Sequence, residues 1–183
     1  MKFIRTQVPG VILIEPDVFD DKRGFFFEFY SKELFAKNGI TVDFVQDNHS
    51  KSAKGVLRGM HFQIPPKAQA KLVKVIKGSA FDVVVDIREG SQTFGKFVSH
   101  VLSAENKKML YVPVGFAHGF CALEEGTEFL YKVSDFYSAK HERGIIWNDS
   151  AIGIPWPKIE GGYILSEKDK KYPTLSSLRG VTQ

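Results

Sequence analysis

The segment GVLRGMHFQ, residues 55–63, places a guanidinium and an imidazole three residues apart, between glycines and apolar side chains. A half-buried strand or loop usually avoids this pair, because burying either Arg58 or His61 without a partner is costly. Three explanations are open at this point. The two residues mark a metal site, they handle an anion and a proton, or they are ordinary polar surface.

The elements that must position these residues are short alternating or β-branched runs separated by glycines. In AFDVVVDIR, residues 80–88, apolar residues at every odd position alternate with a set that includes Asp82 and Asp86, which predicts one core face and one polar face. Closely spaced strands of this kind are typical of an all-β fold, and we expect a cupin-type jelly-roll β-barrel with a few short helices. The predicted strands are residues 72–78, 80–88, 96–102, 109–115, 120–126 and 127–133.

Two short helices are also predicted. Residues 31–39 and 166–173 each begin with a serine suited to the N-cap position, and they end at a glycine and a proline. Residues 174–183 are predicted to be a C-terminal tail. No repeat or linker divides the chain, so residues 1–183 are expected to form one jelly-roll domain.

The composition narrows the class of protein. The 183 residues are 43% hydrophobic and 25% charged, as in soluble globular proteins, and no apolar run approaches the ~18 residues of a membrane span. The net charge of +4 comes from scattered lysines and arginines, which favours a small anionic ligand over nucleic acid or a membrane. Cys121 is the only cysteine, so no internal disulfide can form and a cytoplasmic location is expected.

The metal explanation for His61 is weak. Metal-binding cupins need a His-x-His pair and a glutamate on one segment and another histidine on the next, and His118 matches only the second segment. Gln63 stands where the second histidine of the first segment is required. Lys71 follows, with no carboxylate before Asp82, and its ammonium would repel a cation. We therefore expect no metal.

A site that handles an anion and a proton accounts for the same residues better than a metal site does. An imidazole with a pKa near ~6.5 moves a proton at neutral pH, so His61 suits removal of a proton next to a carbonyl. The enolate that results needs positive charge beside it, and Lys71 is placed to supply it.

Nine segments then identify a resemblance to the dTDP-4-dehydrorhamnose 3,5-epimerase family, and together they span almost all of residues 20–170. Met60 and Phe62 stand where that family more often has leucine and tyrosine. The segments are, in order, KRGFFFE (22–28), QDN (46–48), GVLRGMHFQ (55–63), PPKAQAKLVKVIKG (65–78), DVVVDIR (82–88), SAENKKMLYVPVGFAHGF (103–120), LYKVSDFYS (130–138), ERGIIWND (142–149) and LSEKD (165–169).

The resemblance implies a cofactor-free homodimeric isomerase that inverts C3 and C5 of a dTDP-4-keto-6-deoxyhexose in rhamnose biosynthesis. It implies that His61 is the base, Asp169 its supporting carboxylate, Tyr131 the acid on the opposite face of the sugar and Lys71 the group near the C4 oxygen. The implied contacts to nucleotide and substrate are Arg23, Glu28, Gln46, Asn48, Arg58, His118, Tyr137, Glu142 and Lys168.

Several of these residues have local alternatives. Ser166 and Asp169 have the Ser-x-x-acid spacing of a helix capping box, which would use the carboxylate for backbone donors. Tyr131 is equally suited to a packed barrel wall, and Tyr137 competes with it as the acid. Arg23, in DDKRG, is also typical of a solvated turn.

Two other functions remain open from the sequence. An epimerase that acts only at C3 or only at C5, or a ketoisomerase on the same substrates, would need the same residues. A non-catalytic nucleotide-sugar-binding cupin would not need a base and an opposed acid together. An edge strand near the N-terminus could exchange between the subunits of a dimer.

Overall fold

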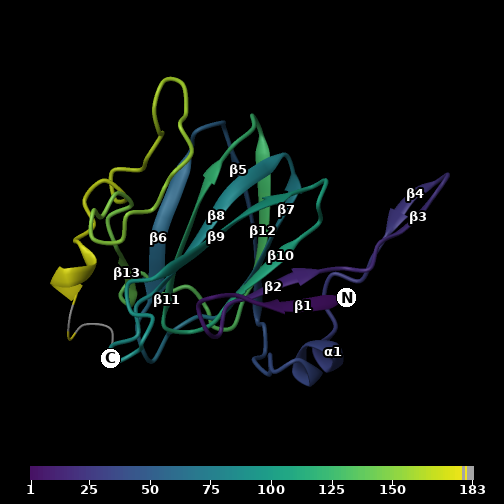
Figure 1. Ribbon diagram of the computed structural model, residues 1–183, viewed down its shortest axis with the longest axis horizontal. Helices are drawn as coiled ribbons and strands as arrows, with labels where there is room; N and C mark the ends of the chain where they lie inside the picture. The colour runs from purple at the N-terminus through teal and green to yellow at the C-terminus, as the bar shows by residue number, and fades with distance from the viewer. Residues whose placement is uncertain (179, 181–183) are drawn as a thin grey trace.

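The computed structural model describes residues 1–178 and residue 180. Two large antiparallel sheets lie face to face, and a small hairpin projects from them (Figure 1). The six-stranded sheet consists, in spatial order, of β1 (Lys2–Arg5), β2 (Ile12–Glu15), β10 (Met109–Val112), β7 (Lys71–Lys77), β12 (Thr127–Val133) and β5 (Gln46–Ser52). The five-stranded sheet consists of β13 (Glu142–Gly144), β6 (Leu57–Gln63), β11 (Phe116–Ala122), β8 (Ser79–Asp86) and β9 (Phe97–Ser103).

The core between the sheets is made of alternate residues from facing strands. Val73 and Phe129 of the six-stranded sheet pack with Val84 and Phe120 of the five-stranded sheet in one buried cluster. The rings of Phe120 and Phe129 are stacked, with centroids 4.2 Å apart and planes 2° apart. This two-sheet arrangement confirms the predicted all-β jelly-roll fold.

The outer face of the five-stranded sheet is covered by the chain that follows β13. Ile145, Ile152 and Leu175 from that segment pack on the sheet in a second buried cluster. Both faces of strand β8 are buried, because Val84 packs in the core between the sheets and Val83 and Val85 pack in the outer cluster. Asp82 and Asp86 are 0% exposed. The predicted polar face of residues 80–88 does not face solvent, because Asp82 and Asp86 are buried within the protein.

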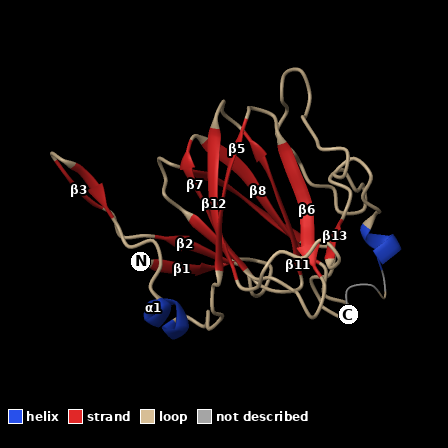
Figure 2. Cartoon of the chain, turned by 180° about the vertical axis from the view of Figure 1, so that it is seen from behind, coloured by secondary structure: helices blue, strands red, loops and turns tan. Residues whose placement is uncertain are grey.

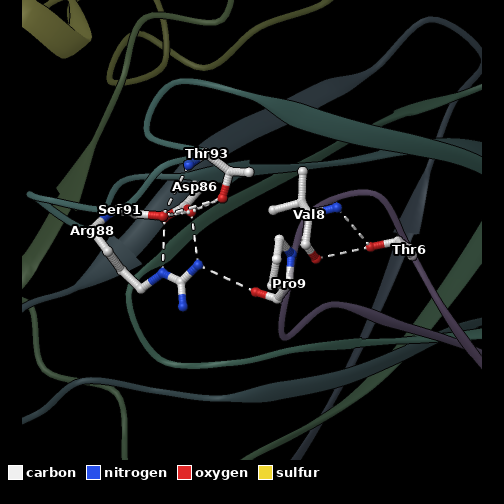
Figure 3. A network of polar contacts seen from close by, with 7 residues as sticks. All are labelled: Thr6, Val8, Pro9, Asp86, Arg88, Ser91 and Thr93. Atoms are coloured by element: carbon white, nitrogen blue, oxygen red, sulfur yellow. Dashed lines mark hydrogen bonds and ion pairs between the residues drawn. The ribbon is translucent and has the colours of Figure 1, made fainter.

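The buried Asp86 carboxylate is the centre of a polar network at the end of β8 (Figure 3). Arg88 donates to both of its oxygens at 2.9 and 2.7 Å and to the carbonyl oxygen of Pro9 at 3.2 Å. The Arg88 guanidinium also lies 4.4 Å from the ring centroid of Phe116, at the start of β11. The network therefore ties β8, the N-terminal loop and the strand that carries His118 together. The backbone N–H of Arg88 and the hydroxyls of Ser91 and Thr93 also donate to the Asp86 carboxylate.

One predicted helix forms and the other does not. Helix α1 (Lys32–Lys37) has Ser31 as its N-cap, and it buries Phe35 against the outer face of the six-stranded sheet. Residues 166–173 form turns instead, so that helix prediction is wrong. The segment SEKDKKYP has no apolar residues at helical spacing, and a short helix without an apolar face to bury has little stability.

The predicted tail, residues 174–183, is partly packed on the domain. It contains the 3₁₀-helix η1 (Leu175–Leu178), whose two leucines are buried against the five-stranded sheet. Residue 179 and residues 181–183 lie outside the described part of the chain. The strand predicted at 120–126 is β11 (Phe116–Ala122), which begins and ends earlier in the chain. Residues 123–126 form the turn into β12.

The hairpin of β3 (Phe19–Asp21) and β4 (Gly24–Phe26) extends away from both large sheets in Figures 1 and 2. Phe19, Phe25 and Phe26 are 65%, 59% and 67% exposed. Across the described residues, no helix is long and apolar enough to cross a membrane.

Candidate active site

Two adjoining cavities of about 340 and 180 Å³ lie between the sheets, and three predicted catalytic residues line both of them. His61 comes from β6 of the five-stranded sheet, whereas Lys71 and Tyr131 come from β7 and β12 of the six-stranded sheet. The larger cavity is also lined by Ser50, Arg58, His118, Phe120, Phe129, Ser166, Lys168 and Asp169. The smaller cavity is also lined by Gln46, Asn48, Phe62, Gln63, Gln69, Tyr137 and Glu142.

His61 and Asp169 form a direct pair, although 108 residues separate them. The Nε2 atom of His61 lies 2.5 Å from the Asp169 Oδ1 atom, and the Asp169 side chain is only 4% exposed. Burial opposes the charge on Asp169, but the bonds from His61 and Ser166 outweigh it and lower the pKa of Asp169. An ionised carboxylate accepts a hydrogen bond from the Nε2–H group, which leaves the lone pair of His61 on Nδ1.

The capping alternative for Asp169 is only partly realised. The Asp169 backbone N–H donates to the Ser166 hydroxyl at 3.1 Å, as a capping serine requires. The carboxylate, however, bonds His61 instead of a backbone donor. The same turn therefore orients Asp169 and leaves its side chain for the imidazole.

Tyr131 lies on the wall opposite His61. It stands across from Asn48 of β5 and packs beside Phe129, so it is part of the barrel wall as well as of the cavities. Burial raises the pKa of Tyr131, so its phenol is protonated at neutral pH. Tyr137, its competitor, is 58% exposed, donates to Glu142 at 3.0 Å and lines only the smaller cavity.

Lys71 is the first residue of β7 and places its ammonium in the space shared by the two cavities. Burial lowers the pKa of Lys71 to about 8, while the carboxylates of Asp82 and Glu142 act in the opposite direction. A positive charge enclosed in this way is screened less than a surface charge, so it interacts strongly with an anion formed beside it.

His118 depends on Asp82, a residue that the sequence analysis did not assign to the site. The His118 Nε2 atom lies 2.8 Å from Asp82 Oδ2, and both side chains are buried. The available signal was the position of Asp82 within the apolar run AFDVVVD. A carboxylate in a strand buried on both faces requires a partner inside the protein.

Polar residues that line the two cavities bond one another. Gln46 Nε2 donates to Asn48 Oδ1 at 2.8 Å, which places these two predicted contacts on one side of β5. The Lys168 ammonium donates to both oxygens of Glu142 at 2.8 Å. Burial opposes the charge on Glu142, but the bonds from Lys168 and Tyr137 prevail and lower the pKa of Glu142.

The predicted arginines lie in different places. Arg58 lines the larger cavity and donates to Ser52 Oγ at 3.2 Å. Arg23 is on the projecting hairpin, where its side chain is 84% exposed and pairs with Asp21 at 2.5 Å. Glu28, just beyond the hairpin, is also exposed. The fold of one chain therefore does not bring Arg23 or Glu28 to the cavities.

Gln63, which stands where metal-binding cupins have a histidine, has a structural role here. Its side-chain amide donates to the carbonyl oxygens of Lys67 and Phe136, and its oxygen accepts the backbone N–H of Ser138. Within residues 1–178 and at residue 180, no cluster of three or more His, Cys, Asp or Glu side chains is arranged to hold a metal ion.

The residues lining the cavities that the sequence did not predict are mostly small, apolar or amide side chains. Phe120 and Phe129 are among them, and nothing in their types or spacing distinguishes them from the other phenylalanines of the core. Only the facing of the two sheets shows that their rings form a floor beside His118. The others are Ser50, Phe62, Gln63, Gln69 and Ser166.

A histidine–carboxylate pair, a buried ammonium and an opposed phenol around one cavity define a jelly-roll enzyme of the acid–base type. The family model of dTDP-4-dehydrorhamnose 3,5-epimerase matches residues 5–177. The chain belongs to this family.

Individual relatives agree with the family model. The dTDP-4-dehydrorhamnose 3,5-epimerases of Shigella flexneri and Pseudomonas aeruginosa are 54% and 55% identical, over 92% and 93% of this chain and 93% and 94% of their own lengths. A Legionella pneumophila 3,5-epimerase structure in complex with dTDP-4-keto-L-rhamnose superposes with a TM-score of 0.92 at 44% identity, covering 96% of this chain and 93% of that one.

Proposed function

We propose that this protein inverts C3 and C5 of dTDP-4-dehydro-6-deoxyglucose to form dTDP-4-dehydro-L-rhamnose, as an isomerase of dTDP-L-rhamnose biosynthesis. The observation that carries the proposal is the placement of His61 with Asp169 on one wall of the cavities and Tyr131 on the other. Inversion needs this arrangement, because a carbon loses its proton from one face and regains one on the other. Family membership supplies the substrate class.

In the first half of each inversion, His61 Nδ1 removes the proton from the carbon next to the C4 carbonyl. The electron pair of the broken C–H bond forms a C=C bond, and the carbonyl electrons move to the C4 oxygen. Asp169 stabilises the imidazolium that forms, since its Oδ1 atom accepts a hydrogen bond from Nε2, 2.5 Å away. Lys71 stabilises the negative charge on the oxygen.

In the second half, Tyr131 donates its proton to the same carbon from the opposite face, and the C4 carbonyl re-forms. The phenol is a suitable acid because burial raises the pKa of Tyr131 and keeps it protonated until the enolate is present. His61 returns its proton to solvent, and the phenolate regains one, so no external oxidant or reductant is needed.

The nucleotide diphosphate is assigned to arginine side chains. Guanidinium forks match phosphate oxygens, and Arg58 lies at the larger cavity with its guanidinium held by Ser52 and the Lys51 carbonyl oxygen. Arg23 and Glu28 are assigned to the same ligand through a second copy of the chain.

A homodimer follows from this assignment. The projecting hairpin carries three exposed phenylalanines next to Arg23, and such an apolar surface is typical of an interface. Seated on a second copy, each hairpin would bury its rings and deliver Arg23 and Glu28 to the other cavity. The buried free thiol of Cys121, which needs no oxidising compartment, agrees with a cytoplasmic location.

The decisive experiment is incubation of the 4-keto sugar nucleotide in deuterated water, followed by NMR of the sugar. We expect deuterium at C3 and C5 and product of the L-rhamno configuration. His61→Asn should abolish incorporation of deuterium. Tyr163→Phe is the control, because Tyr163 lies outside both cavities. Full exchange in His61→Asn would remove His61 from the role of base.

The same spectra separate the alternatives. Exchange at one carbon alone would show a monoepimerase, a serious rival because a 3'-monoepimerase from Streptomyces bikiniensis in complex with dTDP-quinovose superposes with a TM-score of 0.89 at 32% identity, covering 97% of this chain and 89% of that one. Calorimetric binding of dTDP without exchange at either carbon would show a binding protein.

A further inference from the structure

Tyr172 is a residue outside the predicted site that touches the proposed base directly. The rings of His61 and Tyr172 meet edge to face, with centroids 5.6 Å apart and planes inclined by 65°. Tyr172 follows Asp169 by three residues, so one turn of chain supplies both the carboxylate and the ring that contact His61.

The Tyr172 ring is seated on Gly144. In the β13–β6 pairing, Gly144 stands opposite His61. A Cβ atom on Gly144 would lie 2.5–2.6 Å from three carbons of the Tyr172 ring, closer than real contacts allow. The backbone of Gly144 is not in the left-handed region that requires glycine. The absence of a side chain at position 144 is therefore explained by the space that Tyr172 occupies.

The chain holds the ring in place on both sides. After Tyr172, the Ile146 backbone N–H donates to the Pro173 carbonyl oxygen at 2.8 Å, and Leu175 is buried in the cluster on the outer face of the sheet. Before it, Asp169 is fixed by Ser166 and His61. The position of the ring is thus determined by packing and by backbone bonds.

The hydroxyl of Tyr172 does not explain the contact. It is buried and interacts with the Lys168 ammonium, but it forms no hydrogen bond of normal geometry with any described atom. Burial, with a smaller contribution from the Glu142 carboxylate, outweighs the Lys168 ammonium and raises the pKa of Tyr172 to about 12, so the phenol stays protonated near neutral pH. The aromatic ring remains as the functional part.

We propose that Tyr172 is a positioning residue for His61: its ring, seated on Gly144, restricts the imidazole to the orientation in which Nε2 bonds Asp169 and Nδ1 can reach the substrate. The proposal rests on the assignment of His61 as the base. An imidazole on one flexible side chain can rotate, and a carboxylate bonded to one nitrogen does not fix the plane of the ring. A second contact, against the face or edge of the His61 ring, fixes that plane.

The first test compares Tyr172→Phe with Tyr172→Leu. Tyr172→Phe keeps the ring and should retain wild-type kcat, whereas Tyr172→Leu should lower kcat roughly tenfold or more with KM within about twofold, because small misplacements of a reacting group are costly. Tyr163→Leu, a half-buried tyrosine of the cavity lined by Trp147 and Trp156, is the control for loss of a packed ring.

The second test is a double-mutant cycle with Gly144→Ala, which adds a methyl group where the Tyr172 ring lies. Gly144→Ala alone should lower kcat by displacing the ring. In the Tyr172→Leu background it should cost nothing further, so the two effects should not add. Full additivity would show that Gly144 acts through another contact and would contradict the seating argument.

A third measurement does not depend on activity. The ring-proton NMR signals of His61 should shift in Tyr172→Leu and stay near their wild-type positions in Tyr172→Phe. Unchanged signals and unchanged kcat in Tyr172→Leu would overturn the proposal, and equal losses in Phe and Leu would assign the role to the hydroxyl. If wild-type protein showed no sugar exchange at all, the proposed function would fail while these signals would still test the contact.

Discussion

At the scale of single residues, the site combines groups whose charges are set by their surroundings. His61 has a carboxylate on one nitrogen, and Lys71 is a cation that burial makes easier to deprotonate. The roles of these two residues can be tested directly, because a single substitution or a change of pH alters the charge on each site.

Removing the charge of Asp169 should damage catalysis without loss of binding. Asp169→Asn can present its amide to His61 and favour the tautomer with the proton on Nδ1, which is the wrong nitrogen for the base. We expect kcat to fall by roughly 10²–10⁴-fold with a small change in KM. Steady-state kinetics at several pH values measure this, and an unchanged kcat would show that the pair is only structural.

The protonation of Lys71 should limit activity in base. The pKa of Lys71 is lowered to about 8, so the ammonium is present below that pH and is lost as the pH rises through it. We expect kcat to decline above about pH 8. Lys71→Arg should move this decline to higher pH, because a guanidinium stays protonated, and Lys71→Met should remove most activity at every pH.

At the scale of elements, β8 supports the site from two sides. It carries Asp82, which bonds His118, and Asp86, whose network ties the strand to the loop at Pro9. Bonds from Arg88 and neighbouring hydroxyls outweigh burial and lower the pKa of Asp86 to about 2, against 3.8 for an ordinary aspartate.

Stability in acid should therefore depend on Asp86. A carboxyl with a lowered pKa stabilises the fold above the unfolded-state pKa, and this contribution is lost as the pH falls from about 3.8 towards about 2. The shift corresponds to roughly 2 kcal/mol. Asp86→Asn should lower the melting temperature at pH 7 and flatten its dependence between pH 4 and pH 2, measured by calorimetry. Asp47→Asn, an exposed partner of Lys132, is the control.

The elements also show where local sequence information fails. Within the predicted range 31–39, helix α1 (Lys32–Lys37) forms because Phe35 gives it a buried face, and Ser31 caps it as predicted. Residues 166–173 have the same kind of cap but no apolar face, and they form turns around Asp169. In β8 apolar and polar residues alternate as predicted, but both faces of the strand are covered, so Asp82 and Asp86 are buried.

At the scale of the whole molecule, the hairpin of β3 and β4 is the feature that one chain leaves unexplained. Replacing Phe25 and Phe26 together by serine should convert a dimer to a monomer in sedimentation experiments and lower activity, because Arg23 and Glu28 would no longer reach a second cavity. Val101→Ser, an exposed apolar residue of edge strand β9, is the control. A wild-type protein that sediments as a monomer would contradict the dimer.

Local patterns of residues were enough to predict the all-β class, the family and most residues that line the two cavities. Strand alternation and glycine turns depend on neighbours a few residues away, and His61, Lys71, Tyr131 and Asp169 lie in recognisable segments. The folded chain was needed to show that Asp82 bonds His118 and that Gly144 makes room for the Tyr172 ring. It also shows that Arg23 and Glu28 lie away from the cavities of their own chain. Those facts depend on which strands face each other, a choice made by burying two sheets against one another and not by any local stretch of residues.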